Sequence, residues 1–212
     1  MASGYFITGI GTKNLLKLVK RNGITPHPKY FFRFGLLLLY SFCTSAFSVV
    51  EKIVYTKKIK QAQCPKNPII IIGHWRSGTS FLYQLFNAMP GFKTPTMFEI
   101  GTPESFLVSQ KILGPLLQKF LPDKRNVDNV TFGINEPQED EYAIFRATTH
   151  SPVEKLIFPK KGQAFLQEKQ SFVPPDTIKP LWEQALTEFC TKLHLNKEGR
   201  IVLKNHIDVA WN

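Results

Sequence analysis

The feature that most constrains the fold is a run of four isoleucines, Ile69 to Ile72, that ends at Gly73. Adjacent branched apolar residues predict a β-strand buried on both faces, as in the interior of a parallel sheet. Gly78 then allows a tight turn close to a ligand, and Thr79 begins a segment with apolar residues at helical spacing. A strand, a glycine loop and a helix N-terminus in this order can bind an anion through backbone N–H groups and the helix dipole.

The loop has the spacing of a phosphate loop with one substitution. From Gly73 to Ser80 it reads G-x-x-x-x-G-x-S. Thr79 stands where a nucleotide triphosphatase carries its lysine, and the cation comes earlier, at Arg76. We therefore expect anion binding but not hydrolysis of ATP or GTP. The alternative interpretation is a crossover whose glycines serve only the turn; the nearby cation and hydroxyl groups argue against it.

The run Arg76-Ser77-Gly78-Thr79-Ser80 resembles the 5′-phosphosulfate loop of sulfotransferases, a basic residue followed by S-G-T-[TS]. The wider run from Gly73 is similar to the branch of that family common in bacteria, and the resemblance extends from Pro68 onward. It implies an α/β fold with three layers, a P-loop-like arrangement and a parallel sheet. It also implies transfer of a sulfuryl group from 3′-phosphoadenosine 5′-phosphosulfate (PAPS) to a hydroxyl or amine without a metal. Residues 76–80 would bind this co-substrate.

Two candidate catalytic residues follow a second apolar run. Ile201 to Leu203 predicts a short buried strand, with Lys204 at its carboxyl end and His206 two positions later. Ligands of open α/β sheets bind at that edge. The run resembles the Lys-x-His segment of cytosolic sulfotransferases, which implies His206 as the base and Lys204, with Arg76, as a ligand of the sulfate. In the bacterial branch Leu-Lys-Asn is more often followed by proline, so His206 matches only one of the two patterns.

A carboxylate is the alternative base. Glu139 lies in the run from Pro137 to Glu141, which is similar to an acidic segment of the same sulfotransferase branch, and Glu136 is a second candidate. Deprotonation of an acceptor hydroxyl requires a base near the attacking oxygen. Acids at the start of a helix are also favoured by its dipole, so a structural role stays open for this run.

Two further elements are predicted between these segments. Phe92 to Ile100 is interpreted as a second strand, and Ile178 to Leu195 as a helix in the outer layer of the sheet, with apolar residues on one side.

The first 66 residues are interpreted as a basic and hydrophobic helical extension, and residues 67–212 as the N-terminal part of a sulfotransferase domain. Phe34 to Val50 contains 17 residues without a charge, at the short limit for a bilayer span. It starts too far into the chain for a signal peptide. A spanning helix, an in-plane membrane helix and a helix packed on the domain all stay open. We expect membrane contact through residues 13–54.

The net charge and the cysteine content limit the classes of binding partner and the cellular compartment that we expect. The net charge of +11 suits an anionic cofactor or a membrane surface, and the absence of a nucleic-acid-binding signature argues against nucleic acid. The three cysteines are far apart and odd in number, which indicates a reducing compartment. The resemblance implies a cytoplasmic catalytic domain, because PAPS is made there, and a small-molecule, glycan or lipid acceptor.

The chain ends at Asn212, before the segment in which sulfotransferases bind the 3′-phosphate of PAPS. We therefore expect a truncated part of a longer enzyme. Two functions of another class stay open: binding of adenosine phosphates without transfer, and a membrane-surface role with a degenerate P-loop-like domain. A kinase or GTPase would need a P-loop lysine and an acidic residue after a hydrophobic strand, and neither is evident.

Overall fold

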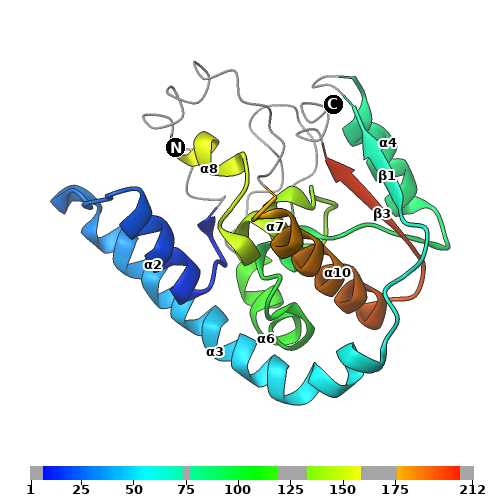
Figure 1. Ribbon diagram of the computed structural model, residues 1–212, viewed down its shortest axis with the longest axis horizontal. Helices are drawn as coiled ribbons and strands as arrows, with labels where there is room; N and C mark the ends of the chain where they lie inside the picture. The colour runs from blue at the N-terminus through cyan, green and yellow to red at the C-terminus, as the bar shows by residue number, and fades with distance from the viewer. Residues whose placement is uncertain (1–6, 74–76, 119–132, 159–175, 206–212) are drawn as a thin grey trace.

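The computed structural model describes residues 7–73, 77–118, 133–158 and 176–205 and is a mixed α/β structure (Figure 1). Its elements are, in chain order, α2 (Thr12–Arg21), the 3-10 turn η1 (Pro28–Tyr30), α3 (Phe31–Gln61), β1 (Ile69–Ile72), α4 (Thr79–Ala88), β2 (Phe92–Lys93), α5 (Met97–Gly101), α6 (Phe106–Gln118), α7 (Glu141–Thr148), α8 (Val153–Ile157), α10 (Lys179–Asn196) and β3 (Arg200–Asn205). The described strands form one small parallel sheet in the order β1-β3-β2.

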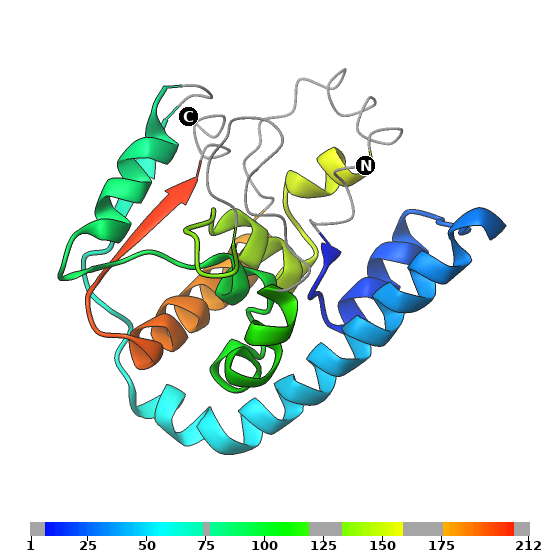
Figure 2. The same ribbon diagram turned by 180° about the vertical axis from the view of Figure 1, so that it is seen from behind.

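Strand β3 is the centre of this sheet and is buried on both faces. Ile201 and Leu203 point to one side, into a core shared with Phe189 and Leu193 of α10. Val202 points to the other side, where it packs with Tyr83 of α4 and with residues of β1. The sheet therefore lies between α4 and a layer that includes α10 (Figures 1 and 2). The strand predicted at 201–203 and the helix predicted at 178–195 are both confirmed.

The expected burial of β1 on both faces is wrong. Ile71 is buried against α4, but Ile70 and Ile72 are each 53% exposed. Among the described strands β1 pairs only with β3, and no residue of β1 belongs to the core that β3 shares with α10. The isoleucine run thus predicted the strand correctly but did not predict its position at the edge of the described sheet.

The strand predicted over 92–100 is also largely wrong. Only Phe92 and Lys93 form β2, and the chain then turns into α5. A capping box explains the turn: the Thr96 hydroxyl accepts from the Glu99 N–H at 3.3 Å, and the Glu99 carboxylate accepts from the Thr96 N–H at 2.8 Å. Local capping overrides the apolar pattern at this point.

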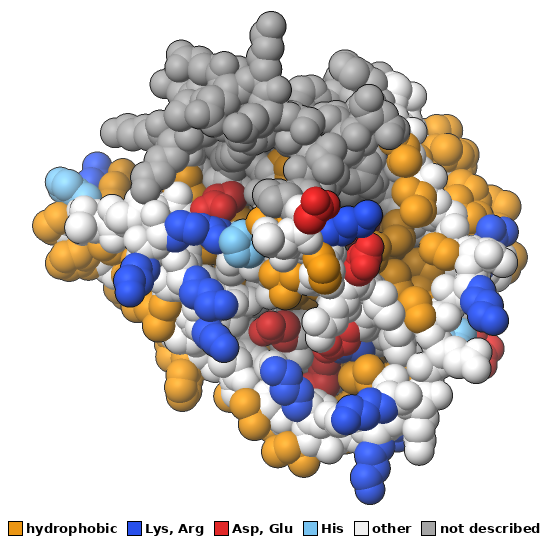
Figure 3. Space-filling view, viewed as in Figure 1, with side chains coloured by type: hydrophobic (Ala, Val, Ile, Leu, Met, Phe, Trp, Pro, Cys, Tyr) orange, Lys and Arg blue, Asp and Glu red, His pale blue; other side chains and the backbone are white. Residues whose placement is uncertain are grey.

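Helix α3 runs along the outer edge of the molecule (Figure 1), where Figure 3 shows hydrophobic side chains at the surface. Its fully buried residues are Ser41, Thr44, Ser48 and Glu51, all polar. The Ser41 hydroxyl donates to the carbonyl of Ile10, 2.8 Å away. By length and composition, Pro28–Gln61 is sufficient to cross a bilayer, which by itself is weak evidence of membrane association.

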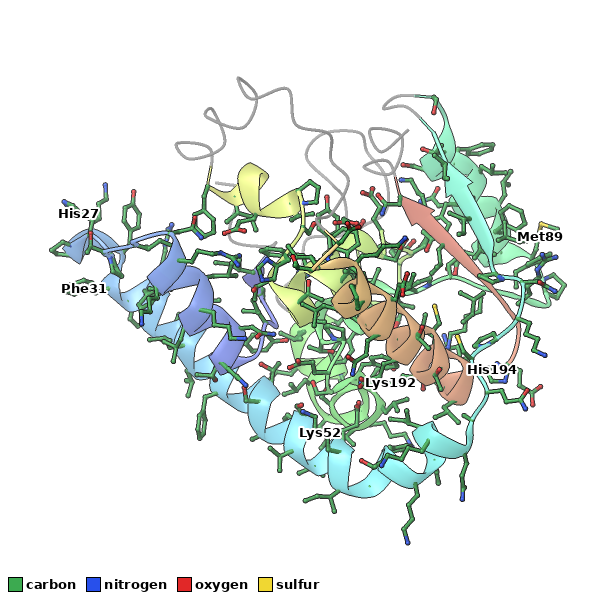
Figure 4. All side chains as sticks on the ribbon, in the orientation of Figure 1. His27, Phe31, Lys52, Met89, Lys192 and His194 are labelled. Atoms are coloured by element: carbon green, nitrogen blue, oxygen red, sulfur yellow. The ribbon has the colours of Figure 1, made fainter. Side chains whose placement is uncertain are left out.

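A buried ion pair joins α3 to α10. The Glu51 carboxylate pairs with the ammonium of Lys192, and each side chain is 2% exposed. Glu51 also accepts from the N–H of Leu107 at 2.8 Å, and Lys192 donates to the carbonyl of Pro103. Burial raises the pKa of Glu51, and the Lys192 charge opposes that shift. Figure 4 shows Lys192 on α10 on the side that faces α3.

We predict that Glu51→Gln lowers the free energy of unfolding by about 3–5 kcal/mol, because it leaves the Lys192 ammonium buried without its counter-ion. The double variant Glu51→Gln/Lys192→Met should recover much of this loss. Lys52→Ala, at an exposed neighbouring position, is the control and should change stability by less than about 0.5 kcal/mol. Urea unfolding measures all three; a single variant as stable as the parent would contradict the role of the pair.

Candidate active site

The described ends of the glycine loop agree with the sequence: β1 ends at Ile72, just before Gly73, and α4 begins at Thr79, just after Gly78. Gly78 is the N-cap of α4 and has φ +86°, a left-handed conformation that favours glycine. At Gly73 a Cβ atom would lie 2.4 Å from Cγ2 of Thr79 and 3.0 Å from Oγ of Ser77. Thr79 and Ser77 therefore pack against Gly73 so closely that a larger residue at this position would clash with them.

The side chain of Lys204 contacts two other predicted site residues, Ser80 and Glu139, beside this loop. Its Nζ donates to Oγ of Ser80 at 2.9 Å and lies 3.2 Å from Oε1 of Glu139. The side chains of Lys204 and Glu139 are 4% and 9% exposed. Parallel pairing places Ile71 of β1 opposite Lys204, so the carboxyl ends of both strands meet beside α4. Three predicted site residues from three distant segments are thus in direct contact.

The two acids after Glu139 hold the end of β3. Oδ1 of Asp140 accepts from the backbone N–H of Lys204 at 3.0 Å. Oε2 of Glu141 accepts from Nδ2 of Asn205 at 2.9 Å. Asp140 and Glu141 therefore have the structural role that the sequence left open, while the carboxylate of Glu139 reaches the lysine side chain.

Tyr83 is a buried member of this cluster that the sequence reading treated as part of an apolar helix. Its hydroxyl lies 3.2 Å from the carbonyl of Gln138 and 3.3 Å from that of Val202. Burial, followed by the charges of Asp140 and Glu139, raises its pKa well above the usual value. The phenol therefore stays neutral and donates. Its position three residues after Ser80, on the same helix face, was the available signal.

The remaining predicted residues are placed as follows. Ser77, Gly78 and Thr79 lie in the loop and the first turn of α4. Glu136 lies in the turn before α7, where its backbone carbonyl accepts from the N–H of Met97 at 2.8 Å. Arg76 and His206 lie outside the described residues, so their roles stay predictions.

A small cavity of about 20 Å³ opens beside the lysine, which is room for about one water molecule. It is lined by Ser80, Tyr83, Gln84, Pro137, Gln138, Glu139 and Lys204. A larger hollow, of about 890 Å³, lies between α3, α7 and α10, and none of these residues lines it. We place the chemistry at the smaller cavity, because a cation, a hydroxyl and a helix N-terminus converge there.

The cluster has the elements of an anion site. The first N–H groups of a helix have no partner within the helix, and the dipole is positive there. The ammonium of Lys204 lies beside Ser80 in this first turn, with Glu139 balancing its charge. An anion that enters the site can replace Glu139 as the partner of the lysine.

We predict that Lys204→Met lowers the free energy of unfolding by about 3 kcal/mol at pH 8, because the buried Glu139 carboxylate loses its cation. Glu139→Gln/Lys204→Met should be more stable than Lys204→Met at the same pH. Lys197→Met, which changes an exposed lysine, is the control, and unfolding in urea is the measurement. A destabilisation that is unchanged by the second substitution would contradict the pairing.

Two curated relatives match the chain. They are proteins named omega-hydroxy-beta-dihydromenaquinone-9 sulfotransferase Stf3, from Mycobacterium bovis and Mycobacterium tuberculosis. Each is 25% identical over 197 residues, which are 90% of this chain and 49% of the relative. The chain thus spans about half the length of the curated relatives it matches. No family model matches the chain, and no solved structure matches it. The chain is therefore similar to these two sulfotransferases over most of its own length.

Proposed function

We propose that the protein is a PAPS-dependent sulfotransferase that acts on a hydroxyl or amine acceptor. The observation that carries the proposal is the contact of the buried Lys204 ammonium with Ser80 at the N-terminus of α4. The homology to sulfotransferases supports the reaction class. The sulfotransferase-like loop supports the choice of donor.

The described residues fit the phosphosulfate end of PAPS. The positive φ of Gly78 brings the backbone close to a ligand, and the Ser80 hydroxyl and the N–H groups of the first turn can donate to the 5′-phosphate. In this proposal Ser77 and Thr79 belong to the same phosphate-binding loop, and Arg76 contributes a second cation. PAPS supplies the sulfuryl group and leaves as adenosine 3′,5′-bisphosphate.

Each residue then has a distinct role. Lys204 and Arg76 stabilise negative charge on the sulfate and on the bridging oxygen. Glu139 holds the Lys204 ammonium in position before the donor binds. We assign the base to His206, because the carboxylate of Glu139 is already paired with the Lys204 ammonium. The acceptor oxygen forms a bond to sulfur, the bond from sulfur to the phosphate oxygen breaks with its electron pair, and the acceptor proton moves to the base.

We propose a lipid hydroxyl as the acceptor class, because the names of the relatives describe a hydroxylated dihydromenaquinone. The proposed location is the cytoplasmic surface of a membrane, where a soluble donor and a lipid acceptor can meet. The apolar helix α3 is consistent with this location.

We predict that the protein binds adenosine 3′,5′-bisphosphate more tightly than ATP–Mg²⁺ and that Ser80→Ala weakens this binding about tenfold or more, through loss of a charge-assisted hydrogen bond. Isothermal titration calorimetry measures both ligands. Ser109→Ala, which removes a hydroxyl from α6 instead, is the matched control. Equal affinity for both nucleotides, or binding unchanged in Ser80→Ala, would contradict the assignment. Binding without transfer to any hydroxylated lipid would favour the non-catalytic alternative.

We predict that His206→Ala lowers kcat/KM by about 10²–10⁴ and removes the rise in rate between pH 5 and 8 that a histidine base gives. Glu139→Gln should lower kcat/KM while keeping that rise. A sulfotransfer assay over this pH range, with PAPS and a hydroxylated lipid, separates the two residues. A pH-dependent rise that is lost in Glu139→Gln and kept in His206→Ala would assign the base to Glu139.

A further inference from the structure

Helix α3 differs from an ordinary surface helix, because its buried side is polar and its exposed side is apolar. Its four fully buried residues are polar. Its outward side carries large apolar residues that are each between 44% and 78% exposed: Phe31, Phe32, Leu36, Leu39, Phe42, Val49, Val50, Ile53 and Val54. We call this set the outer stripe. Only 22% of the most apolar window of the helix is buried, so most of this window lies at the surface of the described structure.

The outer stripe forms one continuous face. At 100° per residue, its members fall within less than half of the helix circumference, on the side opposite Ser41, Thr44 and Ser48. Exposed apolar patches of this extent are rare on monomeric proteins and mark sites of interaction. Figure 3 shows hydrophobic side chains along the outer edge of the molecule where α3 runs, and Figure 4 places Phe31 at the far end of this edge.

The buried polar residues of α3, Ser41, Thr44, Ser48 and Glu51, form a second stripe on the opposite side. This polar stripe faces the rest of the protein. The Ser41 and Ser45 hydroxyls bond to the segment that leads into α2, and Glu51 bonds to α6 and pairs with α10. These contacts extend along the helix from Ser41 to Glu51. A helix that crossed the bilayer in this packing would draw the buried ion pair and the helices bound to it into hydrocarbon, at a high cost in desolvation.

The charges beside the stripe identify its partner. The first 61 residues contain ten Lys or Arg and one acidic residue, Glu51, which is buried and paired with Lys192. This segment therefore supplies nine of the eleven net positive charges. Three exposed lysines lie on α2: Lys13, Lys17 and Lys20. Three more, Lys57, Lys58 and Lys60, lie in α3 after the last residue of the outer stripe. A basic surface beside an apolar stripe matches the headgroup and acyl regions of an anionic bilayer.

We infer that α3 lies in the plane of an anionic membrane surface, with the outer stripe in the acyl boundary and the polar stripe bound to the protein. The helix is an in-plane anchor and not a span. This inference deepens the proposed membrane location and rests on it, but it does not depend on sulfuryl transfer.

Vesicle binding tests the inference directly. The triple variant Leu39→Gln/Phe42→Gln/Ile53→Gln keeps good helix formers and removes three exposed apolar side chains of the outer stripe. Its partition to vesicles of phosphatidylcholine and phosphatidylglycerol in equal amounts should fall at least tenfold. The control Phe81→Gln/Leu85→Gln removes exposed apolar residues of α4 and should bind like the parent.

Depth measurement separates an in-plane helix from a span. Phe32 and Ile53 are both exposed members of the stripe, and 21 residues of helix separate them by about 31 Å, close to the hydrocarbon thickness. Spin labels at Phe32→Cys and Ile53→Cys, in a background with Cys43→Ala and Cys64→Ser, should report equal, shallow depths. Depths on opposite sides of the bilayer would overturn the inference in favour of a span.

Two other outcomes would also overturn it. The first is the absence of vesicle binding by the parent protein. The second is a dimer, detected by light scattering, that the triple variant abolishes, because a second copy of the chain would then cover the outer stripe. The titration with adenosine 3′,5′-bisphosphate is run on the same samples. Loss of vesicle binding with nucleotide binding intact would reject the anchor alone, and the reverse result would reject the proposed donor alone.

Discussion

The contact of the Lys204 ammonium with Ser80 and Glu139 is the interaction on which the core and the candidate site both depend. Lys204 ends the central strand, Ser80 lies in the first turn of α4, and Glu139 precedes α7. A single buried cation thus joins the central strand to the first turn of α4 and to the acidic segment before α7. Because a buried cation is costly unless it is paired, its charge fixes the relative positions of the loop, the strand and the acidic segment.

The same contact explains why a ligand can enter. A buried ion pair contributes little net stability, because desolvation offsets the attraction between its partners. The ammonium is therefore held in place by Glu139 at low net cost and stays available to a stronger anion. The backbone bond from Asp140 to Lys204 anchors the strand end independently, so exchange of partners at Nζ need not disturb the sheet.

Much of this arrangement was predictable, because it follows from local chemistry. The isoleucine run, the two glycines and the short apolar run before Lys204 specify strands and a loop whose carboxyl ends must meet in a parallel sheet. Ser80 and Lys204 were predicted on this basis, and Glu139 from the resemblance of its acidic run to a sulfotransferase segment. The structure brings the three residues together. Tyr83 was missed, because its spacing from Ser80 places it on the same helix face but does not by itself distinguish a buried hydrogen-bond donor from an ordinary core residue.

What could not be predicted depends on distant packing. Ile70 is exposed and is absent from the core that β3 shares with α10. The buried side of α3 depends in part on the pairing of Glu51 with Lys192, which lies 141 positions later in the sequence. Figures 1 and 2 both show the carboxyl ends of β1 and β3 pointing away from α3. With α3 in a membrane surface, the site would face water. That orientation suits a soluble donor, and it requires the reactive hydroxyl of a lipid acceptor to reach outward from the bilayer.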